Sequence, residues 1–249
     1  MTNIPRLYTP VELVSGQLVP LDEGQGKYLT RVMRLAEGAV VRAFNGRCGE
    51  WRCALRVQGK RASLEPLAQT REQDDALDLT LLFAPLKKTR TDFVVEKACE
   101  LGVRAIWPVI TQFTQTSRVR ADRLQAIAVE AAEQTERLDV AQVYEAQVLS
   151  AALSEWDAAK PLYYCDEYGA AKPMSEALRG ETRQSAGLLI GPEGGFSAKE
   201  REMLRSLAFV IPVTLGPRIL RAETAVVSAL TLWQSRVGDW QAAPYLLES

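Results

Sequence analysis

Two loops rich in glycine and proline constrain the fold of this chain more than any other feature of the sequence. The first loop, residues 191–197, follows the apolar run 187–190, and the second, residues 215–221, follows the run 209–214. Each loop leads into a pattern typical of a helix. Ligands of α/β proteins bind in the crevice at the carboxyl ends of parallel strands. Because the two loops are close in sequence, we expect them to line one shared pocket.

The composition excludes several classes of protein. No apolar run approaches the ~20 residues of a membrane helix, and the first ten residues lack a signal-peptide pattern. We therefore expect a cytoplasmic protein with no membrane partner. The chain has no histidine, which removes Ser-His-Asp, Cys-His and HExxH chemistry. The four cysteines form no CxxC pair, so they predict neither a metal site nor a disulfide framework.

Residues 1–73 read as a small β domain, a mostly antiparallel barrel or sandwich. Strand-like runs lie at 39–44, 51–57 and 62–67, with Asn45-Gly46 as a tight turn and an early helical turn at 28–35. This segment carries 11 Lys or Arg against 7 Asp or Glu. The excess is compatible with a polyanion-binding face or with an ordinary solvated surface. The polar stretch 69–78 reads as the linker.

Residues 74–249 read as a second, α/β domain. Apolar runs at 79–83, 105–110, 162–165, 187–190 and 209–215 alternate with helical patterns, the clearest at 122–137. Ser197-Ala198-Lys199-Glu200 is a capping box, which predicts a helix immediately after the first loop. Such alternation predicts a parallel sheet covered by helices on both faces.

The first loop reads Gly191-Pro192-Glu193-Gly194-Gly195. It lacks the Lys-Ser/Thr of a P-loop and the GxGxxG spacing, and the carboxylate of Glu193 would repel phosphate. A neutral or cationic ligand therefore fits better than a phosphate. The alternative, a plain strand-to-helix turn, explains one glycine but not the whole run.

Two groups of charged residues flank these loops. The second loop continues into Arg221, Glu223 and Thr224, whose polar groups either converge on the pocket or pair on the surface. A basic cluster, Lys87, Lys88 and Arg90, precedes a helix that ends at Gly102. It is compatible with phosphate contacts and equally with a role in solubility.

Several motifs occur in a characteristic order. From the amino terminus they are residues 28–35 with Gly38, Glu96-Lys97 followed by Glu100-Leu101-Gly102-Val103, Ala132-Glu133-Gln134 followed by Arg137, residues 190–197, and residues 215–225. Together they resemble the RsmE-type 16S rRNA (uridine-N3) methyltransferases of the SPOUT superfamily. The resemblance spans almost the whole chain.

This resemblance implies an α/β fold: a SPOUT-type parallel-sheet methyltransferase domain with a carboxyl-terminal trefoil knot, preceded by a small PUA-like RNA-binding β-barrel. It implies S-adenosyl-L-methionine (SAM) as cofactor, no metal, a homodimer, and 16S rRNA or the small ribosomal subunit as partner. The cofactor-binding residues that it carries over are Ile190, Gly191, Glu193, Gly194, Gly195, Leu215, Gly216, Ile219, Leu220, Arg221, Thr224 and Ala225.

Without histidine, another group must handle the N3 proton of uridine. The candidates are Arg137 and Arg221, which would stabilise charge on the uracil carbonyls, and Glu223 or Glu193, which would accept the proton directly or through water. The predicted RNA contacts are Arg6, Lys27, Arg31, Arg34, Lys87, Lys88 and Arg90. Three positions depart from the family pattern: Lys27 stands where histidine is usual, Glu136 where a small residue is usual, and Ala141 where proline is usual.

Three other functions remain open at this stage. The chain could methylate another RNA, such as tRNA, with the same chemistry. It could be a non-catalytic RNA-binding factor of ribosome assembly, although neither glycine loop nor Arg221 is missing. A nucleotide-phosphate-binding enzyme is disfavoured by Glu193 and by the absence of a P-loop lysine.

Overall fold

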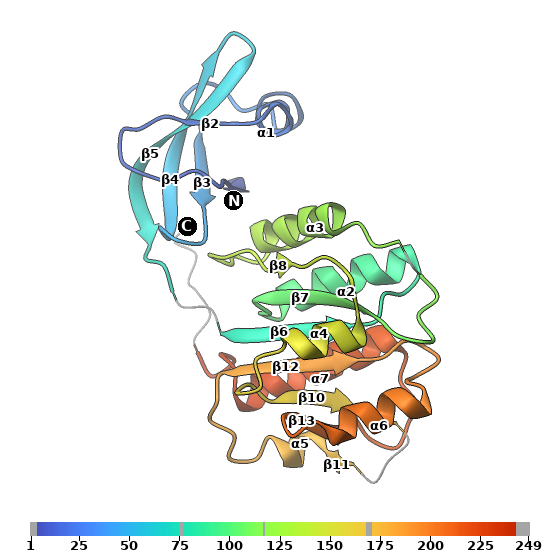
Figure 1. Ribbon diagram of the computed structural model, residues 1–249. Helices are drawn as coiled ribbons and strands as arrows, with labels where there is room; N and C mark the ends of the chain where they lie inside the picture. Colours follow the sequence, from blue (N-terminus) through green and yellow to red (C-terminus); the bar gives the residue numbers. More distant parts are fainter. Residues whose placement is uncertain (1–3, 75–76, 117, 168–170, 243–249) are drawn as a thin grey trace. The chain divides into compact units, whose positions relative to one another are not determined.

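The computed structural model describes residues 4–74, 77–116, 118–167 and 171–242. The chain forms two compact units (Figure 1). The described part of the first unit comprises residues 4–74 and 132–140, and the second holds the remainder. Nothing in the sequence indicates that the segment 132–140 belongs with the first unit.

The first unit is built on a five-stranded sheet in the order β1-β3-β4-β5-β2. Its strands are β1 (Arg6–Tyr8), β2 (Val19–Pro20), β3 (Val40–Phe44), β4 (Glu50–Gln58) and β5 (Arg61–Arg71). β1 runs parallel to β3, and the other pairs are antiparallel. The three longest strands confirm the predicted runs, and Asn45 accepts the backbone N–H groups of Arg47 and Cys48 in the turn between β3 and β4.

The early helix of the first unit begins before the position that the sequence predicts. Helix α1 (Glu23–Lys27) is followed directly by a π-helical turn, η1 (Tyr28–Val32), so the expected start at residue 28 is wrong. The true start is fixed by Asp22, whose side chain accepts the backbone N–H of Gln25 in a capping box. Leu29 from η1 is fully buried in the core of the sheet.

The second unit is built on a parallel sheet in the order β11-β13-β10-β12-β6-β7-β8, with β9 pairing beside β7. Its strands are β6 (Asp78–Phe83), β7 (Ala105–Ile110), β8 (Gln142–Val143), β9 (Gln147–Val148), β10 (Leu162–Cys165), β11 (Lys172–Pro173), β12 (Ser185–Ile190) and β13 (Val210–Thr214). The five longer strands are the predicted ones. β6 and β12 are buried along almost their whole length, as expected of strands covered on both faces.

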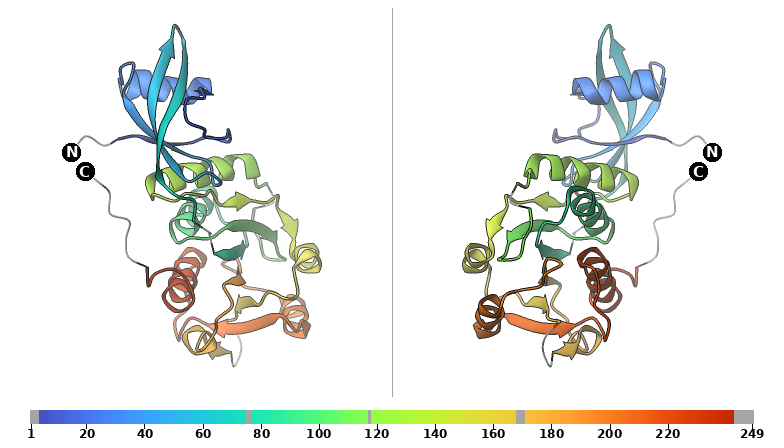
Figure 2. Two further views of the ribbon diagram at one scale, coloured as in Figure 1. Left: turned by 90° about the vertical axis from the view of Figure 1, so that its left-hand side faces the viewer. Right: turned by 90° about the vertical axis from the view of Figure 1, so that its right-hand side faces the viewer.

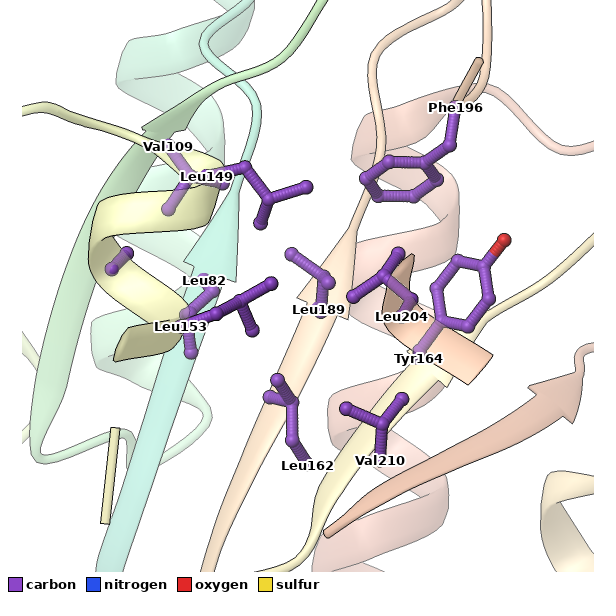
Figure 3. Packing of buried hydrophobic residues seen from close by; sticks show 11 residues of the cluster. Leu82, Val109, Leu149, Leu153, Leu162, Tyr164, Leu189, Phe196, Leu204 and Val210 are labelled. Atoms are coloured by element: carbon purple, nitrogen blue, oxygen red, sulfur yellow. The ribbon is translucent and has the colours of Figure 1, made fainter. Parts of the chain in front are cut away.

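Six helices of the described chain flank this sheet: α2 (Lys88–Glu100), α3 (Ala121–Gln134), α4 (Leu149–Glu155), α5 (Met174–Ala177), α6 (Ala198–Ser206) and α7 (Ala222–Arg236). Helices α4 and α6 cover one face, while α2, α5 and α7 lie together on the other (Figure 2). On the α4–α6 face, Leu149 and Leu153 pack against Leu82, and Leu204 lies near Tyr164 and Leu189 (Figure 3).

Helix boundaries follow local chemistry. The predicted capping box of Ser197 and Glu200 is present at the start of α6. Helix α3 ends at Gln134, before the expected residue 137, and Glu136 has a φ of 61°, which a helix does not allow. None of the helices in the described ranges is long and apolar enough to cross a membrane.

Candidate functional site

A pocket lies at the carboxyl ends of β10, β12 and β13, within the second unit. It is lined by residues from these strand ends and from the loops that follow them: Tyr164, Cys165, Asp166, Glu167, Ile190, Gly191, Pro192, Glu193, Gly195, Phe196, Val213, Thr214, Leu215, Gly216, Pro217, Arg218, Ile219, Leu220, Ala222 and Ala225. The two glycine loops therefore share one pocket, as the sequence predicts.

Close packing explains the glycine at the start of the first loop. A Cβ on Gly191 would lie 2.6 Å from the Phe196 ring, nearer than real Cβ contacts allow. That ring is held in turn by an edge-to-face contact with Tyr164, with centroids 5.1 Å apart. Farther along the two loops, Gly195 and Gly216 adopt φ values of 67° and 112°, which favour glycine.

The end of β10 supplies pocket residues that sequence reasoning missed. The run 162–165 was expected to be a strand, but the polar residues after it were not considered as a third pocket wall. The carboxylate of Asp166 is buried and paired with Arg205. Burial raises the pKa of the neighbouring Cys165 thiol to about 12, so the thiol stays protonated at neutral pH.

Three charged side chains meet beside the pocket. Arg90, on the first turn of α2, lies 3.0 Å from Glu193 (Nη1 to Oε1) and 3.6 Å from Glu223 (Nε to Oε1). The other carboxylate oxygen of Glu223, Oε2, is buried and has no hydrogen-bond partner among the described residues. Arg90 was predicted to contact RNA; the structure places it as the shared partner of two carboxylates.

The predicted catalytic residues come from both units. Arg221 is an exposed residue at the amino-terminal cap of α7, and Glu223 lies in the first turn of that helix. Arg137 belongs to the first unit, where its guanidinium donates to Asp139 at 3.0 and 2.8 Å. Of the predicted cofactor residues, all line the pocket except Gly194, Arg221 and Thr224.

The prediction for Arg6 needs correction. Its side chain is only 3% exposed and lies 2.6 Å from Glu50 (Nε to Oε2), and it donates to the carbonyl oxygens of Ala132 and Arg137. A guanidinium enclosed in this way cannot contact RNA. It instead joins the segment 132–140 to the sheet of the first unit.

Arg6 is one member of a buried group of charges, here called the ionic cluster, formed by Arg6, Arg42, Arg71, Glu50 and Glu136. Arg42 donates to both carboxylate oxygens of Glu136, at 2.6 and 2.8 Å. Burial alone would raise the pKa of Glu50, but the hydrogen bond and charge of Arg6, with Arg42, lower it below its usual value. Glu136, which departs from the family pattern, thus faces arginines.

The remaining predicted RNA contacts are exposed. Lys27, Arg31 and Arg34 lie on and just after α1 and η1, and Lys27 pairs with Glu23. Lys87 and Lys88 lie at the start of α2. Exposure leaves these five side chains available to a ligand, unlike Arg6.

Comparison with known proteins gives a consistent result. Residues 73–234 match a family described as an RNA methyltransferase domain, and residues 21–67 match an RNA methyltransferase PUA domain. The chain is similar to the ribosomal RNA small subunit methyltransferase E of Rickettsia conorii, with 30% identity over 230 residues that cover 90% of this chain and 93% of the relative. It is 31% identical to the Synechocystis protein of that name, covering 90% and 75% of the two chains. A solved structure of the Neisseria gonorrhoeae protein of that name, bound to S-adenosyl methionine, is similar with a TM-score of 0.80 and 30% identity, covering 96% of this chain and all of that one.

Proposed function

The chain belongs to this RNA methyltransferase family, and from that premise we propose that it uses SAM to methylate N3 of one uridine in 16S rRNA. The observation that carries the proposal is the pocket at the carboxyl ends of three parallel strands, lined by both glycine loops. Its position agrees with the general rule for ligands of parallel α/β sheets.

The residues of the pocket suit SAM, a sulfonium cation without phosphate groups. Asp166, Glu167, Glu193 and Arg218 line it, and because Asp166 pairs with Arg205 and Glu193 with Arg90, the charges around the pocket are close to balanced. Apolar side chains such as Leu215 complete the walls. We propose that the predicted cofactor residues that line the pocket bind SAM. Gly194, Arg221 and Thr224 do not line the pocket and are not included among these contacts. When bound, SAM supplies an electrophilic methyl group.

The charged residues beside the pocket support a division of roles. Arg221 is exposed and unpaired within the described chain, so we propose that it stabilises negative charge on the uracil carbonyls. It is preferred to Arg137, whose guanidinium is already bonded to Asp139. Glu223 is the proposed proton acceptor because its Oε2 has no competing donor. Arg90, which faces the other oxygen, positions Glu223 and Glu193.

RNA binding is assigned to the exposed cations of the PUA-like unit, Lys27, Arg31 and Arg34. Contacts of this kind position a nucleic acid without reading its bases. An rRNA substrate implies action in the cytoplasm.

Two further properties are proposed from the family resemblance. The carboxyl-terminal strands and α7 are proposed to form the trefoil knot. The protein is also proposed to be a homodimer, which is supported by apolar side chains exposed on the second unit: Phe93 at 40%, Ile219 at 90% and Trp240 at 49%.

The test is a methyl-transfer assay with labelled SAM. The substrates are small ribosomal subunits and free 16S rRNA from cells that lack the homologous enzyme, and products are identified by nucleoside analysis. We expect N3-methyluridine at one site. Transfer to tRNA alone would redirect the substrate assignment, and SAM binding without any transfer would favour a non-catalytic RNA-binding factor.

A further inference from the structure

A second cavity, separate from the cofactor pocket, lies in the second unit where α2 and α3 begin. Its volume is about 280 Å³, and none of its lining residues lines the cofactor pocket. Four cationic side chains line it: Lys88, Arg118, Arg120 and Arg123. We propose that this cavity binds a backbone phosphate of the RNA substrate, an inference that rests on the proposed function.

The charge around this cavity is only partly neutralised. Arg120 pairs with Asp122 at 2.7 Å (Nη2 to Oδ2), and Arg123 pairs with Asp92. Lys88 and Arg118 are exposed. In the described part of the chain, neither side chain has an ion-pair or hydrogen-bond partner. Two uncompensated positive charges therefore face one cavity. This arrangement suits an anion such as a phosphodiester.

The remaining polar groups of the cavity wall are already used. Thr91 Oγ1 accepts the backbone N–H of Leu86 and donates to its carbonyl oxygen, both at 2.9 Å. Thr116 Oγ1 donates to the same carbonyl at 3.1 Å. These bonds fix the wall but leave no hydroxyl donor for a ligand. Lys88 and Arg118 are therefore the side chains that would bind the phosphate.

The backbone at the cavity adds to the positive field. Helix α2, of 13 residues, begins here, and its cap residue Lys87 makes no side-chain capping hydrogen bond. The free N–H groups and dipole at a helix amino terminus favour an anion. Asp92 opposes this effect, since its Oδ1 is buried without a partner. We therefore place the phosphate on the Lys88 and Arg118 side of the cavity.

The first turn of α2 connects this cavity with the cofactor pocket. Lys88 lines the cavity, and Arg90, two residues later, contacts Glu193, which lines the pocket. An RNA strand with one base in the cofactor pocket could therefore place a backbone phosphate in the cavity, next to the first turn of α2. Such a contact fixes the register of the RNA without reading its sequence.

The test compares two double variants of the full-length protein that each remove two exposed positive charges from the second unit. One is Lys88→Gln with Arg118→Gln. The matched control is Arg179→Gln with Lys199→Gln, exposed cations that line neither cavity. The readout is fluorescence anisotropy of a labelled 16S rRNA fragment over a series of salt concentrations. We expect the cavity variant to flatten the slope of log K against log salt by about one, as expected for the loss of one phosphate contact, with the control unchanged. The SAM affinity of both variants, measured by calorimetry, should equal that of the wild type.

The outcomes separate this inference from the proposed function. An unchanged salt slope in a protein that still methylates RNA would overturn the phosphate site alone. A flattened slope in the cavity variant, with no methyl transfer by the wild type, would support the site and overturn the proposed reaction. A third arm compares thermal stability in inorganic phosphate and in chloride at equal ionic strength. Stabilisation of the wild type by phosphate, with RNA affinity equal in both variants, would assign the cavity to a free phosphate and overturn the RNA contact.

Discussion

The two units use their charged residues in opposite ways. In the first unit, the side chains of the ionic cluster are 2% to 25% exposed, with Arg6 and Glu50 almost fully buried at its centre, and the cluster joins the sheet to residues 132–140. In the second unit, Arg90, Glu193 and Glu223 gather beside a pocket, and their side chains are 16% to 38% exposed. The first arrangement holds distant segments together, whereas the second leaves charge within reach of a ligand.

This difference shows why the net charge of a sequence segment does not indicate which of its charged side chains are exposed. The excess of cations in residues 1–73 suggested a polyanion-binding face, yet Arg6, Arg42 and Arg71 point into the ionic cluster. The more acidic second unit nevertheless keeps unpaired cations around a cavity.

The largest effect is expected from breaking the ionic cluster. Glu50→Gln would leave Arg6 buried without its main counter-charge, which typically costs about 3–5 kcal/mol of folding free energy. The control is Glu65→Gln, which removes a partner of the more exposed Arg56 and should cost far less folding free energy, because solvent screens a surface pair. Urea unfolding measures both values. Equal losses in the two variants would show that the cluster contributes no more than a surface pair.

Acid should weaken the same cluster. The pKa of Glu50 lies below its usual 4.5 in the folded protein, so its contribution is present above that value and is lost as pH falls through the folded pKa. The stability difference between wild type and Glu50→Gln should therefore be largest near pH 7 and shrink below about pH 4. Urea titrations at several pH values measure this difference. A difference independent of pH would show that the ionised form of Glu50 does not stabilise the cluster.

In the second unit, Glu223→Gln tests the charges beside the pocket. If Glu223 accepts the N3 proton, kcat should fall about 100-fold, in the range typical of lost general-base catalysis, while the KM for SAM stays nearly constant. Glu202→Gln, an exposed carboxylate on α6, serves as the control. Steady-state methyl transfer measures both constants. Full turnover by Glu223→Gln would remove Glu223 as the base.

A smaller loss is expected from filling the space at the first loop. In Gly191→Ala the new Cβ would press on Phe196, whose ring is also held by Tyr164, so the loop must shift. We expect SAM affinity to fall about tenfold, or roughly 1.4 kcal/mol. In the control Gly26→Ala, the Cβ lies at an ordinary 3.4 Å from Ala62, and SAM affinity should not change. Calorimetry measures the affinities, and equal values would show that Gly191 does not shape the cofactor site.

Sequence reasoning succeeded where a feature is local. β6 and β12 are mostly apolar runs, and the capping box of α6 spans four residues, so each could be recognised alone. Strands of two or three residues, such as β1 and β11, exist only through their partners and leave no local pattern.

Long-range pairing accounts for the other differences. The ionic cluster joins Arg42 to Glu136, 94 positions apart, which no spacing rule detects. The pocket was predicted from its two glycine loops, while the wall from β10 consists of Tyr164, Cys165, Asp166 and Glu167, none of them glycine, and was missed. Burial of Arg6 likewise depends on residues more than 40 positions away.

The smallest effect concerns the exposed cations of the PUA-like unit. Arg31→Gln with Arg34→Gln removes two charges next to η1, where neither side chain has a partner in the described part of the chain. If both contact phosphates, the slope of log K against log salt should flatten by about one to two, with a several-fold loss of RNA affinity at low salt. Lys60→Gln with Arg61→Gln removes two exposed charges from the β4–β5 turn of the same unit and is the matched control. Equal slopes for the two double variants would mean that the first unit contributes only its general charge, and RNA positioning would then depend on the cavity at the start of α2.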